Sequence, residues 1–312
     1  MAKLSLEKTK QFLKTPGTWR RIGLILPFFL VALIFIVIPM ILMIVKSFSP
    51  TSSGPMSLNW NFMNGFVWQK IAMSLLIAVI TTVITMLLAY PFAYFLCFSV
   101  RSKAAKALLV LLVTAPIWMS MLIKIIGLKT LFDCINGYQN STYGNVFTVI
   151  GLVYLYLPFM ILPIFNVLED MPKNLVNASK DLGYTTFGTF FKVVLPYTKG
   201  ALASGITLVV LPSLTTVAVP QYMNASPSGT MIGDIMMQEG IMAQTSDLSL
   251  ARASTFSFVI ILVMVVAAAI IFGGIKIAKV IKRKKGGIKE WKTKILNKVL
   301  LNFLNDFILW LF

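Results

Sequence analysis

Residues 169–196 read EDMPKNLVNASKDLGYTTFGTFFKVVLP and form a long polar interruption between two apolar runs of the chain. Apolar residues recur in its first half at helical spacing, which predicts a helix over about 174–182. Asp170 or Asn174 is expected to cap the start of this helix. Gly183 suits the positive φ with which many helices end, so we expect the helix to stop there.

A second short helix is expected after this glycine. It runs through Phe187, Phe190 and Phe191 to Pro196, which breaks it or begins the next apolar run. Two helices with an apolar face, placed between two membrane spans, cannot bury that face by themselves. They require the bilayer surface, the protein's own helix bundle or a partner protein.

The composition decides the broad class. The chain has 312 residues, of which 58% are hydrophobic and only 12% are charged. Soluble domains carry about 25% charged residues, so the composition indicates an integral membrane protein. Histidine is absent, which excludes His-based acid–base catalysis and most transition-metal sites. The two cysteines, Cys97 and Cys134, indicate neither a disulfide framework nor a thiolate metal site.

Six apolar windows are long enough to cross a bilayer, which takes about 20 helical residues. They lie at about 22–45, 71–98, 107–130, 146–168, 198–220 and 254–275. The first window is too long for the apolar core of a cleavable signal peptide, so we interpret it as a span. Thr81, Thr82 and Thr85 in the second window indicate a face that contacts other helices rather than lipid. The predicted fold class is therefore all-α integral membrane, with six transmembrane helices.

The basic residues predict the orientation. The net charge is +18, and 23 of the 28 Lys and Arg fall on one side of a six-span arrangement. The positive-inside rule places both termini and residues 169–196 in the cytoplasm, which explains the charge better than nucleic-acid binding does. The expected organisation is a cytoplasmic tail at 1–21, a six-span domain at 22–283 and a cytoplasmic tail at 284–312.

The C-terminal tail has its own pattern. Apolar residues recur at helical spacing from Ile288 to Phe307 with lysines among them, which is typical of an amphipathic helix on an anionic membrane surface. A seventh span is the alternative, but Asn302, Asn305 and Asp306 interrupt it. We favour the surface helix.

The loop at 169–196 resembles the cytoplasmic EAA loop of ABC-importer permeases of the MetI-like family. In that family an E-A-A triplet is followed after three residues by Gly and after nine more by I-x-L-P. Here the triplet is Asn177-Ala178-Ser179, followed by Gly183 and by Val193 to Pro196. The spacing matches, but Asn177 stands where Glu is usual and Ser179 replaces the second Ala.

The resemblance extends over about residues 20–283, and three segments are similar to polyamine-type permeases. They read VYLYLPFMILP at 153–163, APIWMS with LIK at 115–124, and LPSLTT leading into Pro220-Gln221. Some of these permeases carry aromatic residues and an Asp after the last Leu-Pro pair. This chain has Val217-Ala218-Val219 there instead, so it departs from those permeases at this position.

The resemblance implies the fold, the partners and the energy source. It implies a six-span MetI-like permease in a bacterial plasma membrane, paired with a second homologous permease. Two ATPase subunits that bind ATP and Mg²⁺ would dock inside, and an extracytoplasmic binding protein would deliver a polyamine such as spermidine or putrescine. This chain itself has no G-x-x-x-x-G-K-[ST] loop and no expected catalytic residue, metal or cofactor. The residues expected to contact the ATPase are Leu175, Asn177, Ala178, Ser179, Leu182, Gly183 and Phe187.

A polycation requires carboxylates and aromatic faces, because ion pairs and cation–π contacts replace its lost hydration. The candidate residues of the substrate path are Trp118, Tyr156, Phe159, Tyr222, Asp234 and Glu239. Each also has an ordinary role, since loop acids are usually solvated and span aromatics usually belong to the core or the interfacial belt. Lys124 is a further candidate, because a cation inside a span is costly, although near a span end it can extend to the interface.

Two other functions fit part of the sequence. An ABC permease for another solute, such as thiamine, iron or sulfate, would share the same loop. A membrane scaffold without a pore would have no reason for polar spans interrupted by proline. Such residues are tolerated where helices line a cavity or move, and here they include Thr81, Thr82, Thr85, Pro116, Pro158, Pro163 and Pro212.

Overall fold

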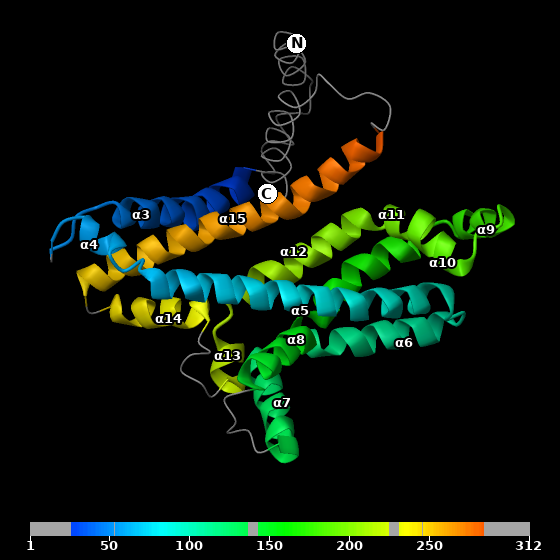
Figure 1. Ribbon diagram of the computed structural model, residues 1–312, viewed down its shortest axis with the longest axis horizontal. Helices are drawn as coiled ribbons and strands as arrows, with labels where there is room; N and C mark the ends of the chain where they lie inside the picture. The colour runs from blue at the N-terminus through cyan, green and yellow to red at the C-terminus, as the bar shows by residue number, and fades with distance from the viewer. Residues whose placement is uncertain (1–25, 53, 137–142, 225–230, 245, 284–312) are drawn as a thin grey trace, which may run out of the picture. The chain divides into compact units, whose positions relative to one another are not determined.

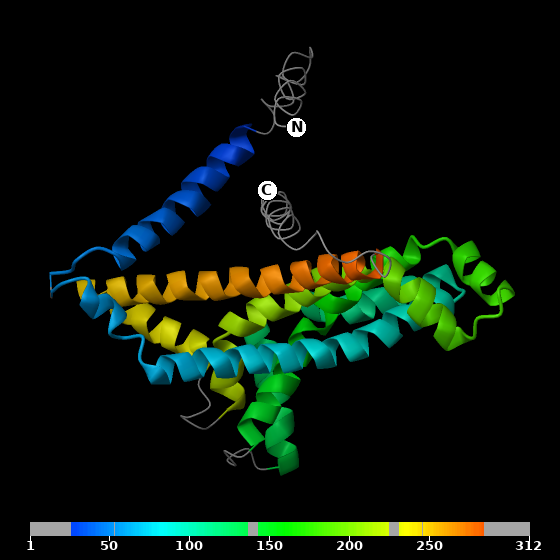
Figure 2. The ribbon, with the colours of Figure 1, turned by 45° about the horizontal axis from the view of Figure 1, so that its top comes forward.

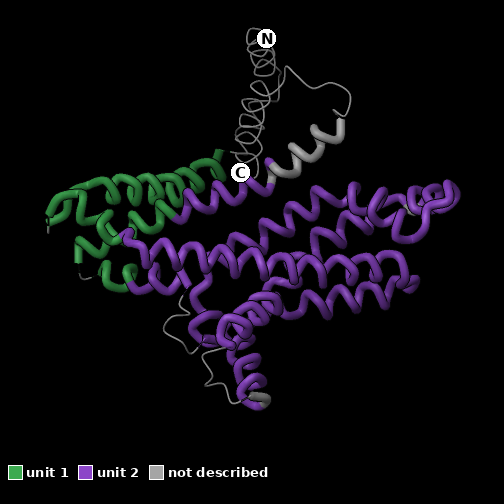
Figure 3. Tube along the Cα trace, viewed as in Figure 1, with its two compact units in different colours: residues 1–62, 239–259 green, residues 63–238, 260–312 purple. Residues whose placement is uncertain are grey.

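The computed structural model describes residues 26–283, apart from 53, 137–142, 225–230 and 245. These residues form helices and no named strand. They divide into two compact units (Figure 3). Unit 1 contains the chain up to residue 62 together with 239–259, and unit 2 contains 63–238 and the chain from 260 onward. The predicted tails at 1–21 and 284–312 lie outside the described residues.

The helices follow one another along the chain as labelled in Figure 1. They include η1 (Leu33–Val37), α3 (Ile38–Ser47), α4 (Ser57–Trp60), α5 (Gly65–Phe98), α6 (Lys103–Thr114), η2 (Ala115–Trp118), α7 (Met121–Asn136), α8 (Gly144–Glu169), α9 (Lys173–Asp181), α10 (Thr186–Thr189), η4 (Phe190–Val194), α11 (Leu195–Tyr197), α12 (Lys199–Thr215), α13 (Ala218–Met223), α14 (Ile232–Met242) and α15 (Asp247–Arg283).

The core of unit 2 lies where α5, α8 and α12 pack side by side (Figures 1 and 2). Small residues such as Ala89 and Ala93 on α5 are fully buried, and they meet Met160 and Ile164 of α8 in one cluster. Helices in a bilayer associate through close packing rather than through a hydrophobic driving force, and small residues permit that approach. These three helices therefore form the frame that holds the other elements of unit 2.

The threonines of α5 confirm the predicted protein-facing side of that span. Thr81, Thr82 and Thr85 are all buried. The hydroxyls of Thr82 and Thr85 donate to the carbonyls of Ala78 and Thr81 one turn earlier, each at 2.7 Å. A hydroxyl that is satisfied within its own helix can be buried against a neighbour at little cost.

Two predicted spans are not the straight helices that the sequence suggested. The window at 107–130 was expected to be continuous, but Lys103–Trp118 and Met121–Cys134 meet at 99°. The break falls at the 3₁₀ turn η2, where Pro116 removes a backbone donor. The window at 198–220 was also wrong at its outer end, because α12 stops at Thr215 and a separate helix, α13, follows.

The number of spans agrees with the predicted fold class. Among the described residues, four helices are long and apolar enough to cross a membrane, and there are up to six spans if each of two bent helix pairs counts as one. The second bent pair joins Thr186–Tyr197 to Lys199–Thr215 at 70°. The outer loop expected at 221–252 was only partly correct, because it contains helix α14.

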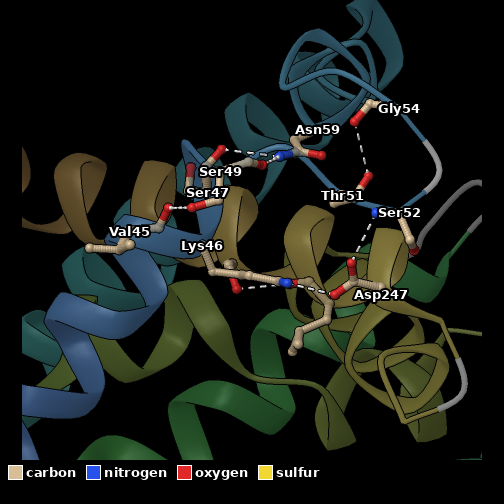
Figure 4. A network of polar contacts seen from close by, with 11 residues as sticks. Val45, Lys46, Ser47, Ser49, Thr51, Ser52, Gly54, Asn59 and Asp247 are labelled. Carbon is tan, nitrogen blue, oxygen red and sulfur yellow. Dashed lines mark hydrogen bonds and ion pairs between the residues drawn. The ribbon is translucent and has the colours of Figure 1, made fainter.

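Within unit 1, polar contacts fix the end of the first span to the start of α15 (Figure 4). The ammonium of Lys46 lies 2.5 Å from the carboxylate of Asp247, which also accepts the backbone N–H of Ser52 at 3.3 Å. The side-chain amide of Asn59 donates to the carbonyls of Ser47 and Ser49. Most apolar side chains of the span Leu26–Ser47 are exposed, which suits a helix that faces lipid or a partner.

The close packing of α8 and α12 can be tested at Gly205. A Cβ on this residue would lie 2.6 Å from the Sδ of Met160, whereas a Cβ on Gly200 of the same helix would meet nothing within 4 Å. We expect Gly205→Leu to destabilise the folded protein by about 1–3 kcal/mol through overpacking, and Gly200→Leu to leave it nearly unchanged. Thermal unfolding midpoints in detergent measure both variants, and equal midpoints would contradict the packing described.

Candidate functional site

The predicted pair of helices is present, and the first of them, α9, has a well-defined C-terminal end. Helix α9 closes with the two backbone bonds of a Schellman motif. Gly183 N–H donates to the Lys180 carbonyl at 2.8 Å, and Tyr184 N–H donates to the Ser179 carbonyl at 3.1 Å. Gly183 has φ +82°, which confirms the predicted role of this glycine. A residue with a Cβ is strained in this conformation, so the reversal between the two helices depends on glycine.

The start of α9 differs from the prediction. Its N-cap residue is Pro172, and no side chain caps the helix. Asp170 instead ends the preceding helix α8, and Asn174 lies within the first turn of α9. The prediction of an Asp170 or Asn174 cap was therefore wrong. The second helix is capped by Thr185, whose hydroxyl accepts the Gly188 N–H at 3.2 Å, and Pro196 lies in the first turn of α11.

One side of this helical hairpin is packed against the frame of unit 2. Val176 and Val194 are buried in the cluster that includes Leu168 of α8. The hydroxyls of Ser179 and Thr189 are buried and lie 2.8 Å apart, which joins α9 to α10. The hairpin is therefore a rigid part of unit 2, and it projects beyond the end of the α5–α8–α12 frame (Figures 1 and 2).

The other side of the hairpin is apolar and exposed. Leu182 and Phe187 are each 79% exposed, and Leu175 is 42% exposed. Asn177, Ala178 and Gly183 are exposed too, whereas Ser179 is buried. Of the seven residues predicted to contact an ATPase, the structure thus places six on the open surface. Phe187 also borders an apolar cavity of about 600 Å³ between α5 and the hairpin. Its alternative role is therefore to pack its ring against the permease itself.

The aromatic candidates of the substrate path are only partly brought together. Tyr156 and Tyr222 pack against one buried cluster, and the ring of Phe159 lies 6.3 Å from that of Tyr156. Trp118, in contrast, is 88% exposed at the bend between α6 and α7. Lys124 is buried on α7 and makes no ion pair with any described residue.

Asp234 lies in the first turn of α14, in a more enclosed environment than a loop acid. Its Oδ2 accepts the Met231 N–H at 2.9 Å, and its Oδ1 is buried without a hydrogen-bond partner among the described residues. Burial raises the pKa of the Asp234 carboxyl, against the opposing effects of the Met231 N–H, the Gln221 amide and the charge of Lys70. Glu239 lies further along α14 and belongs to unit 1.

Four residues near Asp234 were not predicted as site residues. They are Lys70, Ser74, Thr216 and Gln221. The Ser74 hydroxyl accepts the Ile232 N–H at 2.9 Å, which joins α5 to the start of α14. Lys70 precedes Ser74 by one helical turn and is also buried. A Lys and a Ser at positions i and i+4 of a predicted span were visible in the sequence. Because α14 was not predicted, the sequence did not indicate which element these two side chains face.

The hydroxyl pair within the hairpin supports a test of its rigidity. Ser179→Ala leaves the buried Thr189 hydroxyl unpaired, which costs about 1–3 kcal/mol. We expect amide hydrogen exchange over Ser179 to Thr189 to become about tenfold faster or more. The double variant Ser179→Ala with Thr189→Val removes both polar groups and should exchange more slowly than the single variant. Unchanged exchange in Ser179→Ala would show that this bond does not hold the hairpin.

The chain is similar to known transport proteins. The family model described as "Binding-protein-dependent transport system inner membrane component" matches residues 86–281. The Mycoplasma genitalium "Spermidine/putrescine transport system permease protein PotB homolog" is 36% identical over 277 residues, which cover 84% of this chain and 94% of that protein. PotB of Escherichia coli is 31% identical over 207 residues, covering 62% of this chain and 74% of that protein.

A solved structure supports the fold independently of sequence. It is a bacterial ABC transporter involved in the import of the acidic polysaccharide alginate, and the match covers 84% of this chain and 96% of that chain with a TM-score of 0.59. At 14% identity this similarity establishes the fold alone. The family match extends over more than half of the chain, and the Mycoplasma relative aligns along nearly its whole length. The chain therefore belongs to the family of binding-protein-dependent transport system inner membrane components, the MetI-like permeases of ABC importers.

Proposed function

We propose that this permease is a membrane subunit of an ATP-driven importer of polyamines such as spermidine and putrescine, and that it forms half of the translocation path. The observation that carries the substrate class is the 36% identity to a PotB homolog across 84% of this chain. The chemistry near the start of α14 agrees, because Asp234 there is a half-buried carboxylate with one enclosed oxygen, and a carboxylate in such a place suits a polycation.

The energy source in this proposal lies outside the chain. ATP and Mg²⁺ bind to two ATPase subunits, and this permease is not itself catalytic. The hairpin α9–α10 is the coupling element, because its exposed face carries Leu175, Leu182 and Phe187 and so presents large apolar side chains with no cover. Burial of such a face in a groove of the ATPase would remove apolar area from water and stabilise the docked state.

The rigidity of the hairpin lets it transmit force. Val176 and Val194 anchor it to the α5–α8–α12 frame, and Lys106 of α6 pairs with Glu169 at the end of α8 at 2.7 Å. ATP-driven closure of the two ATPases would push the hairpin inward, and the frame would follow as a rigid body. The spans then change from an inward-open to an outward-open arrangement.

The orientation and the remaining partners complete the proposal. Both termini and the hairpin lie in the cytoplasm of a bacterial cell, since 23 of 28 Lys and Arg fall on that side of the six-span arrangement. A second homologous permease completes the translocation path, and an extracytoplasmic binding protein delivers the substrate to the side on which α13 and α14 lie.

Uptake measurements test the substrate. In cells that lack this gene, restoring it should restore uptake of radiolabelled spermidine, and depletion of ATP should abolish that uptake. Excess unlabelled putrescine should compete, whereas thiamine and sulfate should not. If uptake does not return while the protein still co-purifies with an ATPase subunit, the importer assignment holds and the polyamine assignment is wrong.

A pair of substitutions at Gly183 tests the coupling role. Proline fixes φ near −65° and cannot adopt the positive φ found here, so Gly183→Pro should disrupt the hairpin, leave membrane insertion intact and reduce spermidine uptake to background. Asparagine tolerates positive φ, so Gly183→Asn should retain most of the uptake. Normal uptake by the proline variant would contradict the coupling role of the hairpin.

A further inference from the structure

The outer end of α12 is broken directly against the start of α14. Helix α12 ends at Thr215, and Thr216 is extended, with φ −65° and ψ 136°. A Cβ added to Gly233 would lie 2.7 Å and 2.6 Å from the carbonyl oxygens of Thr215 and Thr216. The first turn of α14 therefore lies on the carbonyl end of α12, where helix geometry concentrates partial negative charge.

Two buried oxygen atoms at this junction have no hydrogen-bond partner among the described residues. They are the Asp234 Oδ1 and the Thr216 Oγ1. The Tyr156 hydroxyl and the Gln221 amide interact with Thr216 and with Asp234, respectively, but both groups are neutral, so neither of them supplies a positive charge at the junction. A buried oxygen acceptor without a donor destabilises the protein, and native proteins keep few such groups without a functional reason. An ammonium group has three N–H donors and a positive charge, so it matches a carboxylate, a hydroxyl and helix-end carbonyls together.

Lys70 brings such an ammonium to the junction from α5. It lies one turn before Ser74, whose hydroxyl accepts the Ile232 N–H, so this face of α5 is turned toward the start of α14. Lys70 is only 6% exposed, and its charge and that of Asp234 attract each other. The lysine ammonium also lies 5.2 Å from the centre of the Phe66 ring.

We propose that Asp234, the Thr216 hydroxyl and the carbonyl end of α12 form a binding site for a primary ammonium group of the transported substrate, and that Lys70 is a tethered ammonium that competes for this site. The substrate class rests on the proposed function, whereas the competition rests on the arrangement of these residues.

Exchange of the Lys70 ammonium for a substrate ammonium at Asp234 has a physical advantage. An empty site would leave the half-buried Asp234 carboxylate, with its buried Oδ1, without a counter-charge, which is unfavourable. With Lys70 present, the site keeps a positive partner before the substrate arrives and after it leaves. A small inorganic cation would have to displace the lysine without supplying three N–H donors, so the tether also disfavours its entry.

A structural role for Asp234 is the competing explanation. Its Oδ2 accepts the Met231 N–H, as an acidic residue in the first turn of a helix often does. Loss of such a bond would reduce the amount of folded protein or the maximal rate. It would not make the half-saturating substrate concentration depend on whether residue 70 carries a charge.

Initial rates of radiolabelled spermidine uptake, measured against concentration and normalised to inserted protein, test the proposal. The variants are Lys70→Met, Lys70→Arg, Asp234→Asn and the double variant Lys70→Met/Asp234→Asn. The control is Lys103→Met, which removes an exposed lysine at the start of α6. Lys70→Met should lower the half-saturating concentration about tenfold, since one charged hydrogen bond accounts for that much. Asp234→Asn should raise it, and Lys70→Arg and Lys103→Met should leave it near the wild-type value.

The double variant decides between the two explanations. If Lys70 acts by competing for Asp234, adding Lys70→Met to Asp234→Asn should change the half-saturating concentration no further. An unchanged half-saturating concentration in Lys70→Met, or an equal decrease of it in the Asp234→Asn background, would overturn the competition while wild-type uptake still supports the proposed function.

If wild-type protein restores no spermidine uptake, the proposed function and the ligand both fail. If Lys70→Met does not insert, Lys70→Gln replaces it, and failure of both while Lys70→Arg inserts would make Lys70 structural and overturn the proposal.

Discussion

A backbone N–H or carbonyl that lacks a partner in hydrocarbon costs several kcal/mol, and the rest of this structure depends on that constraint. The described residues meet it with helices, and the buried hydroxyls of Thr82 and Thr85 on α5 donate to carbonyls of their own helix. Irregular backbone in a membrane is tolerated where protein surrounds it or where it lines a polar space. The breaks after Thr114 and after Thr215 are therefore positions where a function is to be sought.

The same frame connects the two ends of unit 2. At one end, Val176 and Val194 bind the α9–α10 hairpin to α5 and α8. At the other end, α12 stops at Thr215, and its carbonyls meet the start of α14. Helix α12 covers Lys199–Thr215, and a 70° bend separates it from Thr186–Tyr197, the second half of the hairpin segment. If the hairpin docks on an ATPase as proposed, the rigid packing of α5, α8 and α12 would carry a displacement of the hairpin to this junction.

Much of the fold could be predicted from the sequence, because it depends on local composition. Apolar windows, the Thr81–Thr85 face and the positive φ of Gly183 all follow from residue types within a few positions of one another. The bend at Pro116 could not be predicted, since Pro158 and Pro163 lie inside the continuous helix α8. Proline alone does not distinguish a break from a tolerated position, because neighbouring helices can compensate for the lost hydrogen bond.

The candidate site was less predictable, for a different physical reason. Asp234 was identified as an acid of the outer loop, but Lys70 and Ser74 are distant in sequence and become neighbours only through packing. Helix α14 was missed because residues 221–252 were interpreted as one polar loop; its start is held both by the local Asp234 carboxylate and by the Ser74 hydroxyl, which is distant in sequence. The exposed face of the hairpin, in contrast, was expected from helical spacing, although its N-cap was not.

The most direct test of the central claim is the accessibility of the hairpin face to a thiol reagent in membranes. Cys97 and Cys134 are first replaced by Ser, and Leu182→Cys or Phe187→Cys is then labelled with and without the co-expressed partner ATPase. Asp181→Cys, on the polar side of α9, serves as the control for general access. We expect the partner to protect positions 182 and 187 and to leave position 181 reactive. Equal labelling of positions 182 and 187 in both membranes would contradict the docking of an ATPase on this face.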